Sequence, residues 1–363
     1  RQMCIRDRCY RYTGAVVENV RVKESPRWLR ERLRACGVRP ISHIVDITNY
    51  VMLEYGQPMH AFDLRYLVGN TVNVRNAKAG ETITTLDGET RELTENMLVI
   101  ADTEKPVAVA GVMGGEYSGI MDDTTTIVFE SACFNGTCVR RTAKALGMRT
   151  EASARYEKEL DPNQTMRALK RALQLVQLLD AGDVVDGVVD CCKKVKEQVT
   201  VDWDYQWINR FIGFDLSEQQ MIDILKKIDF DVRDGKVYAP TFRNDIEHLA
   251  DLAEEVARFY GFHNIPNHML QGAANGKLTH RQSFERKLGN TLLACGCTEV
   301  STFSFISPKA YDKICLPPDS ELRNSIVILN PLGEDTSIMR TTILPSMLDL
   351  SLMHISEPHE TLM

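Results

Sequence analysis

Apolar residues recur at helical spacing along residues 20–39, 162–179 and 249–260. Further helices are expected over residues 44–55, 217–228 and 281–296, and from Thr137 onward. In the helix expected within residues 20–39, Ser25 is the expected cap and Pro26 the first helical residue. The helix over residues 44–55 should end at Gly56, because Pro58 cannot continue a helix and holds the preceding residue outside the α region.

Alternation of polar and apolar residues between positions 71 and 115 predicts β-strands. Asp87-Gly88 lies between two such runs and is a strong signal for a tight hairpin. A strand over residues 199–203, a second hairpin at Asp234-Gly235 and a strand pair over residues 298–306 are expected further along. This mixture of strands and helices predicts a multidomain α+β protein.

A chain of 363 residues is too long for one ordinary core and indicates two or three domains. The expected domains cover residues 20–190, 198–267 and 278–350. The segment over residues 180–198, with its glycines, acids and lysines, is the expected linker. Residues 1–19 are interpreted as a remnant with an artefactual start, and residues 352–363 as an artefactual tail, both outside the fold.

The composition, at 44% hydrophobic and 26% charged residues, is typical of a globular protein. The net charge of −7 excludes a chain that is basic throughout, yet residues 20–39 are locally basic. A basic helix there either lies along RNA phosphates or presents a solvated face over an apolar stripe. The sequence has no apolar run long enough to span a membrane and no visible signal peptide, so we expect a cytoplasmic location. The ten cysteines lack paired CxxC motifs, and we expect reduced thiols.

The run DITNYVMLEYGQPMHAFD, from Asp46 to Asp63, has an unusual density of polar residues for a buried segment. His60 follows its turn, where functional residues tend to lie, although a single imidazole is more often a hydrogen-bonded structural residue. Two later segments, VFESACF over residues 128–134 and RTEASARYEKELDP over residues 149–162, complete a pattern with GQPMHAFD.

In this order and at these separations, the three segments resemble the editing domain of bacterial phenylalanyl-tRNA synthetase β subunits. The resemblance runs from about residue 20 to residue 350. It implies a B3/B4-type tRNA-editing domain, then a small B5 domain with a winged-helix-like topology. The third region then corresponds to the start of a class II synthetase catalytic-like α+β domain that has lost its chemistry.

The resemblance implies that the chain hydrolyses tyrosine from mischarged tRNA(Phe), using His60, Glu130, Thr150 and Ala152. Glu130 would accept a hydrogen bond from the tyrosyl hydroxyl, directly or through a backbone amide. His60 would position the terminal adenosine or the attacking water, and the other two would form the pocket wall. From the residues alone, Glu130 is equally a paired strand carboxylate, Thr150 a helix cap and Ala152 plain packing. A nucleophile beside a base is not evident, which favours attack by water over a covalent intermediate.

The helix over residues 249–260 places leucine, alanine and valine side chains on one face, and its acidic residues are expected on the opposite face. Asp245 is expected at the helix start, as a candidate cap, and Arg258 close enough to pair with Glu254 or Glu255. The pattern alone indicates a solvated acidic face. The resemblance implies instead a Mg²⁺ site, shared with an α subunit, whose ligands are Asp245, Asp251, Glu254 and Glu255.

The partners implied by the resemblance are tRNA(Phe) and an α subunit in an α2β2 assembly, with no membrane. That α subunit would bind ATP and ligate phenylalanine to the tRNA. Two rival functions remain: a free-standing aminoacyl-tRNA deacylase, and a non-catalytic RNA-binding or scaffold subunit. Deacylation of mischarged tRNA separates the scaffold from both enzymes, and co-purification with an α subunit separates the β subunit from the free-standing deacylase.

Overall fold

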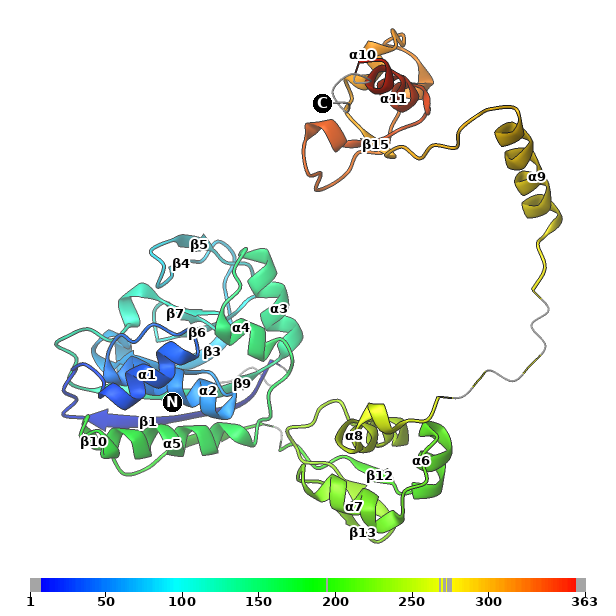
Figure 1. The fold of residues 1–363 in the computed structure, drawn as a ribbon. Coiled ribbons are helices and arrows are strands. Elements are labelled where there is room, and N and C mark those ends of the chain that lie inside the picture. Colours follow the sequence, from blue (N-terminus) through cyan, green and yellow to red (C-terminus); the bar gives the residue numbers. More distant parts are fainter. Residues whose placement is uncertain (1–7, 194, 268, 270–271, 273–275, 357–363) are drawn as a thin grey trace. The chain divides into compact units, whose positions relative to one another are not determined.

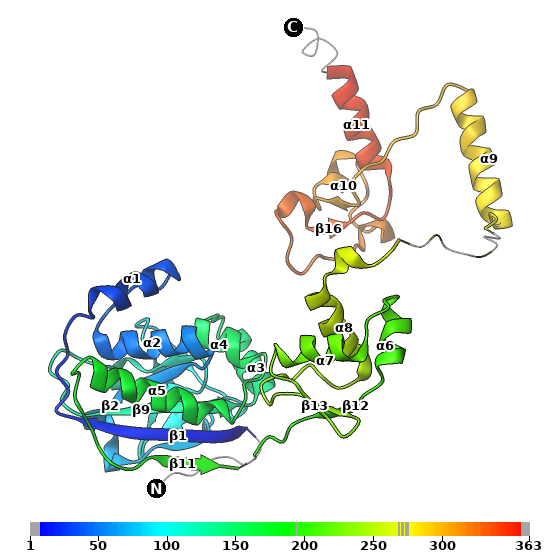
Figure 2. The same cartoon turned by 60° about the horizontal axis from the view of Figure 1, so that its bottom comes forward.

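An antiparallel sheet of five strands, the first sheet, organises the N-terminal part of the computed structural model, which describes residues 8–193, 195–267, 269, 272 and 276–356. Its order is β10-β1-β9-β2, with β11 also paired to β1. Figure 1 labels β10, β1 and β9 of this sheet, and Figure 2 labels β2 and β11 as well. The strands are β1 (Cys9–Glu18), β2 (Met59–Asp63), β9 (Ile127–Phe134), β10 (Asp183–Val184) and β11 (Val189–Cys192). Strands that are far apart in the sequence therefore meet in one sheet.

Three helices cover one face of the first sheet. They are α1 (Arg27–Ala35), α2 (His43–Tyr55) and α5 (Gln164–Leu178), and Figure 2 shows α2 and α5 along the sheet. Ile127 and Phe129 of β9 pack there with Leu29, Ile47 and Leu169. Alternate residues of the same strand point to the other face, as expected for a strand buried on both sides.

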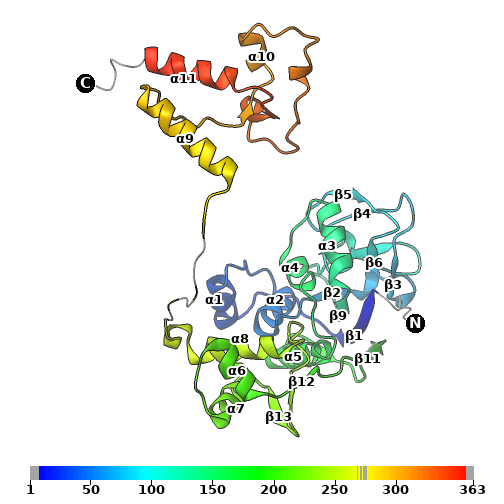
Figure 3. The ribbon, with the colours of Figure 1, turned by 90° about the vertical axis from the view of Figure 1, so that its right-hand side faces the viewer.

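The opposite face packs against the second sheet, whose order is β3-β6-β7-β8. Its strands are β3 (Asn73–Asn76), β6 (Leu98–Ala101), β7 (Pro106–Val109) and β8 (Met113–Gly114). In Figure 3, α1 and α2 lie on one side of β1, β2 and β9, while β3 and β6 lie on the other. Two short helices close this layer, α3 (Gly136–Ala145) and α4 (Glu151–Tyr156), and β4 (Thr82–Thr84) pairs with β5 (Thr90–Glu92) in the hairpin expected at Asp87-Gly88.

Local chemistry explains where the helices begin and end. Gly56 adopts φ 72° directly after α2, which ends that helix as expected. The prediction for α1 was wrong by one position: Pro26 lies at the cap, and the Ser25 hydroxyl instead donates to Asp46 Oδ2 at 2.5 Å. Ser25 and Asp46 are both buried, so this bond connects the start of α1 to the first turn of α2.

A small module follows, built on a three-stranded sheet of order β12-β14-β13. Its elements are β12 (Thr200–Asp202), α6 (Tyr205–Ile212), α7 (Glu218–Lys226), β13 (Asp231–Arg233), β14 (Lys236–Tyr238) and α8 (Leu249–Tyr260). The hairpin at Asp234-Gly235 is present, with φ 52° and 69°. Met221, Leu225 and Leu252 are fully buried in its core, and the chain thus has the α+β architecture expected from the sequence.

Residues Met269–Met363 form a separate unit. Its elements are α9 (His280–Ala294), β15 (Phe305–Ile306), α10 (Ala310–Lys313), β16 (Ile338–Met339) and α11 (Leu344–Ser356). The strand pair expected over residues 298–306 is reduced to Phe305–Ile306, which pairs with β16. Tyr311 is the one large side chain of this unit that is fully buried in its small core, as far as the chain is described.

Two expected domain limits change. β1 is an interior strand of the first sheet, so residues 9–18 belong to the N-terminal domain and are no remnant. Residues 352–356 continue helix α11. The rest of the expected artefacts, residues 1–7 and 357–363, lie outside the described residues. Helices of the length and apolar character that a membrane crossing requires are not found in the described part of the chain.

Candidate functional site

A pocket of about 240 Å³ opens between the first sheet and the second sheet. His60, Glu130, Thr150 and Ala152 all line it, so four residues chosen from three separate segments meet at one place. The pocket also has lining residues that sequence reasoning did not select: Asn49, Met52, Leu86, Gly114, Glu151 and Tyr156. We refer to this pocket as the candidate site.

Strand pairing brings His60 and Glu130 together. β2 and β9 are antiparallel neighbours, and in their register His60 lies directly opposite Glu130. Side chains that are opposite each other in adjacent strands share one face of the sheet. On this face the neighbouring residues are Phe62 on β2 and Ala132 and Phe134 on β9, which are buried and apolar.

The imidazole of His60 packs edge-on against Phe62, with ring centroids 4.5 Å apart. Its Nε2 is buried and has no hydrogen-bond partner among the described residues. Burial lowers the pKa of His60 to about 4, so the ring is neutral at pH 7. Gly114 makes this position possible, because a Cβ there would stand 2.7 Å from His60 Cε1.

Glu130 is 5% exposed, and the Tyr12 hydroxyl donates a hydrogen bond to its Oε2 at 2.8 Å. Tyr12 lies on β1, where its neighbour Gly14 is the strand partner of Glu130. A carboxylate has lone pairs for several donors, so a hydrogen bond to Oε2 leaves Glu130 able to accept from a ligand as well. The paired strand carboxylate that we considered for Glu130 is therefore present, and it also lines the candidate site.

Thr150 caps helix α4. Its Oγ1 accepts a hydrogen bond from Ser153 N at 3.0 Å and donates one to Val112 O at 2.8 Å. The second bond connects the start of α4 to the segment between β7 and β8, and this connection shapes one wall of the candidate site. Ala152 follows in the first turn and packs, half-buried, against the core between the two sheets.

Gln57 and Tyr156 fix the chain beside His60. Gln57 Nε2 and Tyr156 Oη both donate to Ala132 O, at 2.8 and 3.0 Å, and both side chains are buried. Burial raises the pKa of Tyr156, so its hydroxyl stays protonated and keeps donating. The sequence signal for this pair is the place of Gln57 directly before Pro58, where the residue pattern predicts only the end of a helix.

The expected metal ligands are not gathered into a site. In the described residues, no group of three or more His, Cys, Asp or Glu side chains could hold a metal ion. Arg243 forms a two-bond ion pair with Asp245, at 2.8 and 2.6 Å, and the carboxylate of Asp251 accepts two backbone N–H groups at the start of α8. In this single chain, the carboxylates of Asp245 and Asp251 are therefore bound to protein donors and are not gathered around a position for Mg²⁺.

Two expectations for α8 were wrong and one is confirmed. Glu255 is 5% exposed and does not share a solvated face with Glu254, which is exposed. Asp245 precedes the helix without capping it, because the cap is His248. The pairing of Arg258 is confirmed for Glu255, with Nη2 to Oε2 at 2.5 Å. Magnesium binding in a complex with an α subunit stays a prediction.

Three family models match consecutive parts of the chain. The B3/4 domain matches residues 8–180, the tRNA synthetase B5 domain residues 201–262, and the phenylalanyl tRNA synthetase beta chain CLM domain residues 265–360. The chain is also similar to an N-terminal fragment of the phenylalanyl-tRNA synthetase β subunit from Pyrococcus horikoshii. That likeness has a TM-score of 0.32 and 15% identity over 69% of this chain and 70% of the other, too low to support an argument.

Curated relatives extend the match to nearly the whole chain. The phenylalanine–tRNA ligase beta subunit of Clostridium acetobutylicum is 46% identical over 97% of this chain and 45% of its own length. Those of Clostridium tetani and Carboxydothermus hydrogenoformans are each 44% identical, over 94% and 98% of this chain and 44% and 45% of theirs. The chain thus spans about 45% of the length of these relatives. On these three domain matches and this identity, the chain belongs to the family of phenylalanyl-tRNA synthetase β subunits.

Proposed function

We propose that the chain acts within a phenylalanyl-tRNA synthetase β subunit and that its candidate site hydrolyses tyrosine from mischarged tRNA(Phe). The observation that carries the proposal is the register that sets His60 opposite Glu130 at the side of a pocket also lined by Thr150 and Ala152. In this proposal an α subunit, implied by the names of the relatives, binds ATP and ligates phenylalanine to tRNA(Phe). The complex works in the cytoplasm, and none of the steps assigned to this chain uses magnesium.

In this proposal, the candidate site distinguishes tyrosine from phenylalanine by the single hydroxyl group of tyrosine. An apolar pocket rejects an added hydroxyl by only about 10²-fold, so a synthetic site selective for phenylalanine still accepts some tyrosine. A second site that hydrogen-bonds the hydroxyl discriminates far more strongly, because phenylalanine leaves its buried polar group unpaired. Glu130 meets this requirement, since it is a nearly buried carboxylate with apolar neighbours that still lines the pocket.

His60 supports the chemistry as a neutral group. A neutral imidazole with an unpartnered, buried Nε2 can hold either a ribose hydroxyl of the terminal adenosine or the attacking water. The water oxygen adds to the ester carbonyl carbon, the bond from that carbon to the ribose oxygen breaks, and the ribose oxygen takes up a proton. Tyrosine and a tRNA with a free 3′ end are released.

The described residues near the site favour water over a protein nucleophile. The Thr150 hydroxyl donates to Val112 O and so is not directed at a base. Cys133 lies on the opposite face of β9 from Glu130, and burial raises the pKa of its thiol to about 12. A thiol with that pKa is not a thiolate at neutral pH, and it cannot act as a nucleophile in this pocket.

Deacylation of mischarged tRNA tests the proposal. We expect His60→Ala and Glu130→Ala to slow the release of tyrosine from tyrosyl-tRNA(Phe) by about 10² or more, with the fold unchanged by circular dichroism. Matched controls are His280→Ala and Glu92→Ala, two exposed positions outside the pocket, and both should deacylate at the wild-type rate. Unchanged deacylation in both pocket variants would remove the editing assignment.

The subunit role has its own test. Mixing the chain with a phenylalanyl-tRNA synthetase α subunit should give a complex that native mass measurement detects. If the chain deacylates mischarged tRNA but does not bind the α subunit, the free-standing deacylase is the better description. If the chain binds RNA but does not deacylate mischarged tRNA, the non-catalytic scaffold subunit is the better description.

A further inference from the structure

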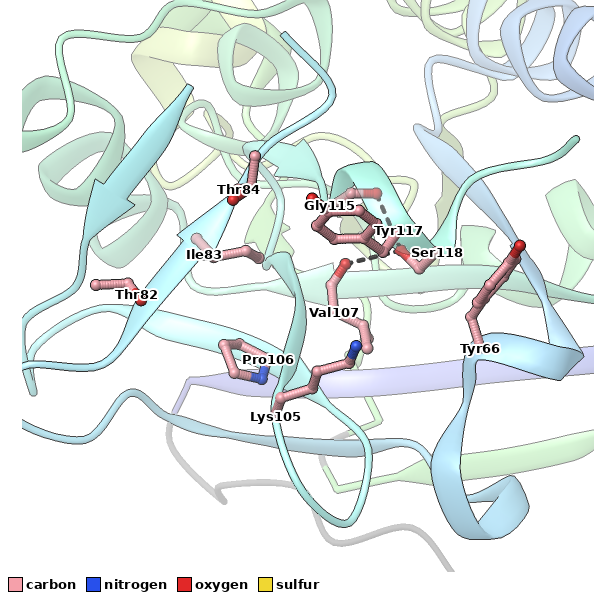
Figure 4. A pocket seen from close by; sticks show the side chains of 10 residues that line it. All are labelled: Tyr66, Thr82, Ile83, Thr84, Lys105, Pro106, Val107, Gly115, Tyr117 and Ser118. Atoms are coloured by element: carbon pink, nitrogen blue, oxygen red, sulfur yellow. Dashed lines mark hydrogen bonds between the residues drawn. The ribbon is translucent and has the colours of Figure 1, made fainter. Parts of the chain in front are cut away.

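A second pocket lies beside the candidate site and has a different chemical character. It has a volume of about 230 Å³ and is formed by η1 (Leu64–Tyr66), β4, the start of β7 and the segment from Gly115 into η3 (Glu116–Ser118) (Figure 4). We call it the second pocket. Its volume is similar to the 240 Å³ of the candidate site, and it is large enough to accept a ring of a ligand rather than water alone.

The two pockets share a wall. Val107 lines the second pocket, whereas Ala108 of the same strand lines the candidate site. Likewise Gly115 faces the second pocket and Gly114 the candidate site. Because neighbouring residues of a strand point to opposite sides, β7 and the end of β8 separate the pockets by the thickness of one strand layer. A ligand that extends from one pocket into the other has to pass the edge of the second sheet, which is formed by β8.

Two tyrosine rings and one ammonium group give the second pocket its chemistry. Tyr66 is 38% exposed and Tyr117 is 63% exposed, so both rings can be covered by a ligand. Figure 4 shows the two rings on either side of Ser118, with the Lys105 side chain extending toward them. Lys105 Nζ lies 5.9 Å from the Tyr117 ring centroid.

The charge of the second pocket is positive. Its lining residues include Lys105 and no carboxylate. Lys105 makes no ion pair with any residue that the structure describes. The nearby Arg65, 5.7 Å from the Tyr66 ring centroid, is instead paired with Asp63 and Asp123, at 2.7 and 2.8 Å. Lys105 is therefore the cation that remains available for an anionic ligand.

The backbone around Tyr117 is tightly connected. Ser118 Oγ donates to Val107 O at 2.9 Å, and Gly115 N donates to the same oxygen at 2.8 Å. Gly115 has no room for a side chain, because a Cβ would stand 2.5 Å from Val107 O. The backbone that carries the Tyr117 ring is therefore already ordered before a ligand arrives, which reduces the entropy lost on binding.

We propose that the second pocket binds the nucleotide that precedes the terminal adenosine at the 3′ end of the tRNA. Aromatic rings that stack on bases, with a cation beside them for a phosphate, are the means by which proteins hold single-stranded RNA without reading its sequence. Tyr117 stacks on the base, and Lys105 contacts the phosphate that links that nucleotide to the adenosine. This inference rests on the proposed function, because the adenosine occupies the adjoining candidate site.

Two model substrates of different length test the inference in the full chain. One is tyrosine esterified to the 3′ hydroxyl of adenosine, and the other is tyrosine esterified to a trinucleotide that ends in the same adenosine. We expect a higher kcat/KM for the trinucleotide ester. Tyr117→Ala should reduce kcat/KM for the trinucleotide ester by about tenfold, the size of effect that loss of one base stack produces. The ratio of the two kcat/KM values should fall accordingly.

Three further variants sharpen the test. Tyr117→Phe keeps the ring and should keep the wild-type ratio. Lys105→Ala should reduce the ratio and lower the salt dependence of log KM for the trinucleotide ester by about 0.7, the value for one phosphate contact on a single strand. Lys78→Ala, an exposed lysine of the same domain outside both pockets, should change neither quantity.

Each outcome has a separate meaning. If wild type hydrolyses both esters and Tyr117→Ala and Lys105→Ala leave the ratio unchanged, the second pocket does not bind RNA, although the proposed function stands. If wild type hydrolyses neither ester, the proposed function fails and the inference fails with it. If a free nucleoside monophosphate inhibits hydrolysis of the adenosine ester in wild type but not in Tyr117→Ala, the pocket is a site for free nucleotides and not for the RNA end.

Discussion

The ring nitrogen Nε2 of His60 is buried without a hydrogen-bond partner among the described residues, and this fixes how the residue titrates. Burial lowers the pKa to about 4, against about 6.5 for an unfolded histidine. As the pH falls from 6.5 to 4, the unfolded chain binds a proton on His60 and the folded chain does not. The contribution of His60 to folding stability is therefore fully present above pH 6.5 and decreases as the pH falls from 6.5 to 4.

A pH titration of the His60 ring protons by NMR checks this value. The Cε1–H signal, assigned by its loss in His60→Ala, should move with a midpoint near pH 4. Hydrolysis of tyrosyl-tRNA(Phe) should show no decline with a midpoint near 6.5. A midpoint near 6.5 in the NMR titration would mean that the imidazole is solvated and the pocket more open than described.

The position of the His60 ring requires a glycine at position 114. In Gly114→Ala the new Cβ would stand 2.7 Å from His60 Cε1, so the imidazole must shift. We expect deacylation to fall by about tenfold or more, while circular dichroism and the unfolding midpoint stay close to wild type. Gly119→Ala is the matched control, since its Cβ would make only an ordinary 3.5 Å contact. Equal deacylation rates for the two variants would show that the His60 position does not matter.

At the scale of single elements, helix α8 shows how a sequence pattern can mislead. An ideal helix drawn from Leu249 to Tyr260 puts Glu255 on the polar side, yet Glu255 is buried between Arg243 and Arg258. The deciding partner, Arg243, lies outside the helix, in the segment before it. Burial opposes ionisation of Glu255, but the hydrogen bonds from the two arginines outweigh it and lower its pKa.

Glu255, which is buried between the two arginines, and Glu254, which is exposed, form a matched pair for measurements of stability. Glu255→Gln should destabilise the small module by roughly 2–4 kcal/mol, because it leaves two guanidinium groups without their shared partner. Glu254→Gln, at an exposed position, should change stability by less than about 0.5 kcal/mol. Because the pKa of Glu255 is lowered, its stabilising effect is present above about pH 4.5 and lost as the pH falls below its folded-state pKa. Urea unfolding at pH 7 and pH 3 measures both effects, and equal stability of the two variants at pH 7 would contradict the buried ion pair.

The sequence predicted most helices and both hairpins, because glycines, prolines and caps act locally. Gly56 and Asp234-Gly235 take the backbone conformations that their residue types favour. It also selected His60, Glu130, Thr150 and Ala152, which the structure brings into one pocket, although their roles stay predictions. What it could not supply were partners set by distant strands, such as Tyr12 against Glu130 and Gly114 against His60.

For the whole molecule, the candidate site and the second pocket belong entirely to the unit Arg1–His268. Residues 1–268 expressed alone should therefore deacylate tyrosyl-tRNA(Phe) with a kcat within about twofold of the 363-residue chain. The unit Met269–Met363 has a small core and exposes Phe303, Leu329 and Leu332 almost completely. Its amides should exchange with deuterium much faster than those of β9. Loss of hydrolysis on truncation would show that the second unit contributes to the site.

Strand β1 is synthesised well before β9, the strand with which it pairs along most of its length. It ends at Glu18, while its central partner β9 begins at Ile127, so roughly 110 residues must be synthesised before the two can pair. At about 5–20 residues per second, a ribosome needs on the order of 5 to 20 s for that length. During this interval the nascent strand has both edges unpaired, which makes it a natural binding segment for chaperones and a risk for aggregation at high expression.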